Sequence, residues 1–106
     1  MSGFSLGPQA KEKLTEIYRY TLDRYGEDQA DRYVGGMFAL FEDVASGTPR
    51  ARLIPPEFGV MGYFVRYERH FVYWRKRASG GVSILAILHT SQLQTERLRA
   101  AFGLTE

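Results

Sequence analysis

An eight-residue stretch near the C-terminal end constrains the fold of this chain most strongly. Residues 82–89 read Val-Ser-Ile-Leu-Ala-Ile-Leu-His and are apolar at both odd and even positions. Successive side chains of a β-strand point to opposite faces, so a strand of this composition has two faces to bury. Such a strand is tolerated only inside a sheet that is covered on both sides. We therefore predict that residues 82–89 form the central strand of the fold.

The N-terminal part of the chain predicts a short strand followed by a helical hairpin. Residues 4–6 alternate apolar and polar before Gly7-Pro8, which ends the strand. Apolar residues then recur with a period of 3.6 over residues 10–25, and Gly26 stands where a helix C-cap needs a positive φ. A second helix begins at Glu27 or Asp28. Because so little chain separates the two helices, they must fold back as an antiparallel hairpin.

The second helix carries more apolar residues than one stripe requires. It is therefore buried on two sides, or it leaves a surface for a partner. Gly35-Gly36 in its middle costs about 1 kcal/mol per glycine relative to alanine. Close approach of another backbone explains the pair better than a functional hinge does.

The C-terminal half predicts a β-hairpin, the buried strand and a last helix. Residues 46–59 hold three of the four prolines and form a connecting loop. Residues 60–67 and 70–77 are rich in aromatic and β-branched residues and pair across the Glu68-Arg69 turn. Ser91 and Gln94 resemble a capping box for the final helix. The prediction is one α+β domain over residues 1–106, a helical hairpin on a small antiparallel sheet in the order β-α-α-β-β-β-α.

Composition excludes several classes of chemistry. The 106 residues include no cysteine, and His70 and His89 show no metal-ligand spacing, so we predict neither a metal site nor a thiolate nucleophile. No glycine-rich phosphate loop is present, and no cofactor is expected. The apolar runs are too short to cross a bilayer, and the first residues lack the features of a signal peptide. We expect a cytoplasmic protein without membrane contact.

The positive charge is concentrated in one segment. The net charge of +2 divides into −3 over residues 1–47, +5 over residues 48–77 and zero over the remainder. Eleven of the fourteen cationic side chains are arginine, whose planar fork suits carboxylates and phosphates. A polyanion or an acidic partner is therefore favoured over a neutral substrate.

A ribonuclease is the enzymatic alternative that the residues allow. It would draw on Glu68, Arg69, His70, Tyr73 and His89 as proton carriers and phosphate stabilisers. Alternation places His70 and Tyr73 on opposite faces of a regular strand, which separates them unless the sheet is bulged. Structural roles for both histidines stay open, and we predict no catalytic residue.

Three segments together resemble the ParE toxins of the ParE/RelE superfamily. Within residues 7–33 the chain has a Leu-x-x-Ile-x-x-Tyr helix, an aromatic-Gly junction and a Gln-Ala-x-x-Tyr start to the second helix. Residues 69–75, Arg-His-Phe-Val-Tyr-Trp-Arg, resemble a strand of that family. Residues 83–89, ending in Ile-Leu-His, resemble its last strand. The similarity spans nearly the whole chain.

The resemblance implies the toxin half of a type II toxin–antitoxin module. A ParD-like antitoxin with an acidic, partly disordered tail would neutralise the toxin, and operator DNA would be reached only through that antitoxin. ParE-like members poison DNA gyrase without known hydrolytic chemistry, whereas RelE-like members cut messenger RNA on the ribosome. Where those ribonucleases carry basic or aromatic acid–base groups, this chain has Thr90-Ser91, and the position of their central-strand arginine is His70.

We therefore expect a non-enzymatic, ParE-like inhibitor of DNA gyrase. A ribosome-dependent messenger RNA endoribonuclease and a non-toxic antitoxin-binding module are the alternatives. A deep polar cavity with converging imidazole, carboxylate and guanidinium groups would contradict a function by binding alone. The residues expected to bind the target are Arg66, Arg69, His70, Arg75, Arg77 and His89, and those expected to bind the antitoxin are Leu14, Tyr18, Tyr33, Met37, Phe41 and Tyr73.

Overall fold

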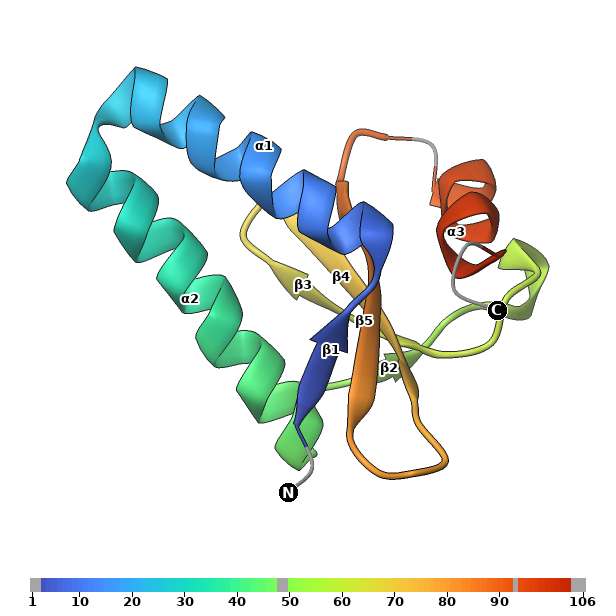
Figure 1. Ribbon diagram of the computed structural model, residues 1–106. Coiled ribbons are helices and arrows are strands. Elements are labelled where there is room, and N and C mark those ends of the chain that lie inside the picture. The colour runs from blue at the N-terminus through green and yellow to red at the C-terminus, as the bar shows by residue number, and fades with distance from the viewer. Residues whose placement is uncertain (1–2, 48–49, 93, 104–106) are drawn as a thin grey trace.

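The computed structural model describes residues 3–47, 50–92 and 94–103 and has two helical layers around one sheet (Figure 1). A hairpin of two long helices covers one face, and a short C-terminal helix lies on the other. The elements are β1 (Phe4–Leu6), α1 (Pro8–Tyr25), α2 (Glu27–Ser46), β2 (Arg52–Leu53), the 3-10 turn η1 (Pro56–Phe58), β3 (Tyr63–Tyr67), β4 (His70–Lys76), β5 (Val82–His89) and α3 (Gln94–Gly103).

The predicted α+β architecture is confirmed, with one difference in the sheet. The strand order is β1-β5-β4-β3-β2, and β1 pairs with β5 in parallel while the other pairs are antiparallel. The sheet is therefore mixed rather than purely antiparallel. A parallel neighbour needs a long crossover connection, and the chain between β1 and β5 provides one that includes the helical hairpin. The geometric middle of the sheet is β4, with β5 beside it.

Two apolar cores meet on β5, as its two-sided sequence predicts. Ile84 and Ile87 belong to the core beneath the helical hairpin, and both are fully buried. Leu85 and Leu88 belong to the core that α3 closes with Leu98. Each buried side chain of this size contributes about 1.5–3 kcal/mol relative to an exposed one, so β5 anchors both layers.

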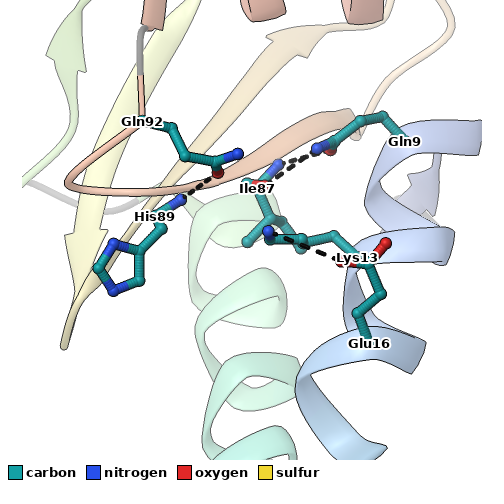
Figure 2. Close-up of polar contacts among 6 residues, drawn as sticks. All are labelled: Gln9, Lys13, Glu16, Ile87, His89 and Gln92. Carbon is teal, nitrogen blue, oxygen red and sulfur yellow. Dashed lines mark hydrogen bonds and ion pairs between the residues drawn. The ribbon is translucent and has the colours of Figure 1, made fainter. Parts of the chain in front are cut away.

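The side chain of Gln9 extends the pairing of β5 beyond the end of β1. The backbone N–H of Gly7 donates to the carbonyl of Ile84, and there the chain turns into α1. Figure 2 shows the Gln9 amide opposite Ile87, where Nε2 donates to the carbonyl at 3.1 Å and Oε1 accepts the N–H at 2.9 Å. The amide thus takes the place of a further strand residue and fixes α1 to the sheet.

The two glycines of α2 have different roles. A Cβ on Gly36 would overlap the hydroxyl of Tyr67, whereas a Cβ on Gly35 would meet nothing within 4 Å. The Tyr67 hydroxyl passes Gly36 and donates to the carbonyl of Tyr33 at 2.9 Å. The close approach expected at this pair is therefore made by a tyrosine side chain rather than by another backbone.

Local differences from the sequence prediction lie in the connections. The loop predicted over residues 46–59 contains β2 and η1, which are too short to give a periodic signal, and its residues 48–49 lie outside the described part. The strand predicted from residue 60 begins at Tyr63. Ser91 does not act as the predicted cap, because α3 begins at Gln94 and the Ser91 hydroxyl lies 2.8 Å from Nδ1 of His89.

Substitution of the two glycines separates packing from helix propensity. We expect Gly36→Ala to lower the free energy of unfolding by about 1–3 kcal/mol, because the added methyl displaces Tyr67. Gly35→Ala is the matched control and should raise stability by about 0.5–1 kcal/mol, since alanine is the better helix former in open space. Urea unfolding followed by circular dichroism measures both, and equal effects of the two substitutions would contradict this account.

Candidate functional site

The residues predicted to bind the target lie at two ends of the β3–β4 hairpin. Arg66 and Arg69 flank the turn, where His70 pairs with His89 of β5. Arg75 and Arg77 lie at the other end of the hairpin. Five residues of strand lie between Arg69 and Arg75, and six steps along a strand span about 20 Å. The cations therefore form two local groups rather than one continuous patch.

Two of these arginines close turns. Nε of Arg66 donates to the carbonyl of Glu68 at 2.8 Å, and Nε of Arg77 donates to the carbonyl of Gly80 at 3.0 Å. The Arg77 guanidinium also reaches the carbonyl of Gly3 at 3.5 Å. Both side chains satisfy backbone acceptors at chain reversals, so part of the basicity of this segment serves the fold.

Arg69, His70 and His89 line a groove between the helical hairpin and the end of the sheet, whereas Arg75 does not. We call it the histidine groove; its volume is about 730 Å³, and α1, α2, the β3–β4 turn and the end of β5 form its walls. His70 and His89 are direct partners across β4 and β5, with ring centroids 5.3 Å apart and perpendicular rings. The groove also contains Lys13, Glu68 and Arg69.

Each imidazole has a hydrogen-bond partner at Nδ1. The Tyr33 hydroxyl lies 2.9 Å from Nδ1 of His70. Burial raises the pKa of Tyr33 to about 12, which keeps the donor proton in place. Nδ1 of His89 accepts the backbone N–H of Ser91 at 3.1 Å. The neutral His89 ring therefore carries its proton on Nε2.

His70 stays neutral over the physiological range. Burial lowers its pKa to about 4, and the positive charges available at His89 and Lys13 act in the same direction. Only 9% of the residue is exposed. An imidazole with this pKa is a weak base at neutral pH.

The groove contains the kinds of side chain that an acid–base enzyme would need, but the protonation of its histidines suits binding better than catalysis. Imidazole, carboxylate and guanidinium side chains line one open depression, which is the combination expected of a reaction centre. Nδ1 of each histidine already has a hydrogen-bond partner within the fold, and burial lowers the pKa of His70, which makes it a weak base. Tyr73 lies on the opposite face, in the core closed by α3, despite a β-bulge beside it. Among the described residues no three potential ligands gather around a metal position.

The residues predicted to bind the antitoxin are divided between the two cores. Leu14, Met37 and Phe41 are buried between the helical hairpin and the sheet, where they pack against β5 and its neighbours. Tyr18 donates to Asp31 at 2.8 Å and links the two helices. Tyr33 lines the histidine groove and Tyr73 lies on the other face. These six residues do not form one surface, and their role in antitoxin binding stays a prediction.

A second groove was not predicted from the sequence. We call it the edge groove; it has a volume of about 730 Å³ and runs between β3, the end of β4 and α3. Leu53 and Met61 on its wall are 71% and 83% exposed. Three cations surround it: the Arg75 guanidinium lies 5.0 Å from the ring centroid of Phe102, the Lys76 ammonium lies 5.1 Å from that of Tyr63, and Arg99 donates to the carbonyl of Phe58 at 3.0 Å. Exposed apolar side chains among cations suit an acidic, partly apolar partner.

Comparison with known proteins gives the family of this chain. Residues 4–94 match the model of the ParE toxin of the type II toxin–antitoxin system, parDE. The chain belongs to the ParE toxin family. The proteins named Toxin ParE1 from two strains of Mycobacterium tuberculosis, CDC 1551 / Oshkosh and H37Rv, are each 28% identical over 88 residues, which are 83% of this chain and 89% of theirs.

Membership of this family assigns the chain to the toxin half of a toxin–antitoxin module, and it implies an antitoxin partner. The resemblance inferred from the hairpin and strand motifs is therefore confirmed. No helix in residues 3–47, 50–92 or 94–103 of the toxin is long and apolar enough to cross a bilayer.

The lowered pKa of His70 makes stability depend on pH. The unfolded chain binds a proton at this residue below about pH 6.5, whereas the folded toxin does so only near pH 4. Protonation therefore favours the unfolded state, and stability is lost as the pH falls from 6.5 towards 4. When the pH falls from 7 to 5, we expect His70→Gln to lose about 1 kcal/mol less stability than the unsubstituted toxin, a figure that allows for screening by solvent in the groove. A His70 imidazole titration with a midpoint near 6.5 by NMR would contradict the burial argument.

Proposed function

We propose that this toxin inhibits DNA gyrase by binding it and that a ParD-like antitoxin neutralises it in the cytoplasm. The observation that carries this proposal is that Nδ1 of both histidines has a partner within the fold and that burial lowers the pKa of His70 to about 4, which leaves the best candidate reaction centre with a weak base. A surface that binds other macromolecules explains the exposed cations and apolar side chains, and such a surface needs no catalytic groups. The family supplies the expectation of gyrase as the target.

The edge groove is the surface that best fits an acidic antitoxin tail. Arg75, Lys76 and Arg99 would attract carboxylates, and the exposed Leu53 and Met61 would be covered by the apolar residues of the tail. Among residues 3–47, 50–92 and 94–103, no acidic side chain lines this groove. The two-residue strand β2 is the last strand of the described sheet, and an extended segment of the antitoxin would pair along its outer edge.

Inhibition of gyrase is the first test of this proposal. Purified toxin added to gyrase and relaxed plasmid should block supercoiling or accumulate cleaved DNA, and prior addition of the cognate antitoxin should prevent the effect. The readout is the distribution of topoisomers on an agarose gel. Full supercoiling activity at micromolar toxin would reject gyrase as the target. It would not bear on antitoxin binding, which is measured separately by calorimetry.

Charge reversal in the edge groove tests the antitoxin site. We expect the pair Lys76→Glu and Arg99→Glu to weaken antitoxin binding by about 10-fold or more and to reduce its salt dependence, because both changes oppose an acidic tail. Lys11→Glu is the matched control, since it reverses one exposed charge on α1 away from the groove. Isothermal titration calorimetry at two salt concentrations measures the effect, and equal affinity for the pair and the control would place the tail elsewhere.

A ribosome-dependent endoribonuclease is the second candidate function. The convergence of His70, His89, Arg69 and Glu68 in the histidine groove favours it. It predicts cleavage of messenger RNA in a translating extract and loss of cleavage in His70→Ala or His89→Ala. Uncut message at micromolar toxin excludes this function. Normal growth on uncontrolled expression would favour the third candidate, a non-toxic module that retains only antitoxin binding.

A further inference from the structure

The methionines of the toxin differ sharply in their access to solvent. Of the three in the chain, Met37 is fully buried beneath the helical hairpin, Met61 is 83% exposed, and Met1 lies outside the described residues. A small reagent dissolved in water therefore reaches the Met61 thioether directly, whereas it reaches Met37 only when the fold opens. The chemistry of the two sulfurs is the same, so exposure alone makes Met61 the more reactive.

Backbone hydrogen bonds hold the loop that carries Met61 on both sides of this residue. Before it, the N–H of Gly59 donates to the carbonyl of Pro56 at 3.0 Å and closes the turn η1. After it, the carbonyl of Gly62 accepts the N–H of Ile54 at 3.0 Å and joins the loop to the chain that follows β2. Because the loop is anchored at both ends, the exposure of Met61 is a property of the fold.

Oxidation at this position would change the edge groove and leave the core as it is. Met61 and Leu53 supply exposed apolar surface on the wall of that groove, beside its cations. Methionine sulfoxide is polar, so oxidation would remove part of the surface that an apolar residue of a partner would cover. A side chain that is 83% exposed packs little against the rest of the toxin, and its change therefore costs the fold little.

The reaction requires a peroxide as its oxidant. A lone pair of the Met61 sulfur attacks one oxygen of hydrogen peroxide, and the S–O bond forms as the O–O bond breaks. The second oxygen leaves as water after it takes up the proton of the transferred hydroxyl. The sulfur is thus oxidised and the peroxide reduced by one electron pair, and methionine sulfoxide reductases reverse the change.

We propose that Met61 is an oxidation-sensitive residue of the edge groove, and that its sulfoxide leaves the toxin folded but weakens binding of the acidic, partly apolar antitoxin tail. The weakened binding rests on the antitoxin site proposed above, whereas the selective oxidation rests on the exposure of Met61 alone. A peroxide would then shift the toxin towards its unbound form. In the complex, the bound tail would shield the sulfur from the same reagent.

Peptide mass mapping of toxin exposed to hydrogen peroxide measures oxidation at each methionine separately. In the free toxin, sulfoxide should form about 10-fold faster or more at Met61 than at Met37, with an unchanged circular dichroism spectrum. In the toxin–antitoxin complex, the rate at Met61 should fall about 5-fold or more, because the tail excludes the reagent. Equal rates at the two methionines of the free toxin, or an unchanged Met61 rate in the complex, would overturn the proposal.

Calorimetry with the antitoxin tests the effect on binding, and Met61→Leu is its control. Peroxide-treated toxin, freed of peroxide before mixing, should bind about 5-fold or more weakly, and methionine sulfoxide reductases should restore the affinity. Met61→Leu has no sulfur at this position, so its own affinity should be the same before and after treatment.

Two results of the calorimetry would contradict the proposal. An equal loss in Met61→Leu would place the sensitive residue elsewhere. An affinity that oxidation does not change would overturn the role of Met61 while leaving the toxin–antitoxin complex intact, whereas failure of the untreated toxin to bind antitoxin would overturn the proposed function as well.

Discussion

The structure depends on the need to cover β5 on both faces and on both edges. Its side chains enter two cores, one on each face, so neither the helical hairpin nor α3 can be removed without exposing apolar surface. β4 pairs along one edge, and β1 followed by the Gln9 amide pairs along the other. This demand places α1 across the sheet, and it leaves the outer part of the hairpin extending past the end of β5 (Figure 1).

Both candidate surfaces follow from that placement. The histidine groove lies where the hairpin passes the end of β4 and β5, and the Tyr33 hydroxyl connects the two layers there through His70. The edge groove lies where α3 covers only part of the opposite face and leaves Met61 exposed. Cations surround the edge groove, whereas the histidine groove has Glu16 and Glu68 beside its cations. Complementary charge therefore supports an acidic partner at the edge groove, as proposed above.

The sequence predicted the elements better than it predicted the surfaces. Two-sided apolarity identified β5, and the 3.6-residue period identified α1, because the positions of apolar residues along a segment show which of its faces are buried. The same period cannot distinguish a core residue from an interface residue, so Met37 was assigned to antitoxin binding although it is fully buried in the fold. The edge groove combines residues from the loop after η1, β4 and α3, and no local pattern links them. Arg77 looked like part of a binding patch but satisfies the carbonyl of Gly80.

Direct association with gyrase tests the central claim, which is that this toxin acts by docking rather than by catalysis. Analytical ultracentrifugation of purified toxin with gyrase, with and without DNA, measures whether a complex of defined stoichiometry forms. The account predicts a saturable complex at micromolar concentrations, formed equally well when no RNA is present. Separate sedimentation of toxin and gyrase, together with cleavage of messenger RNA by substoichiometric toxin, would contradict it.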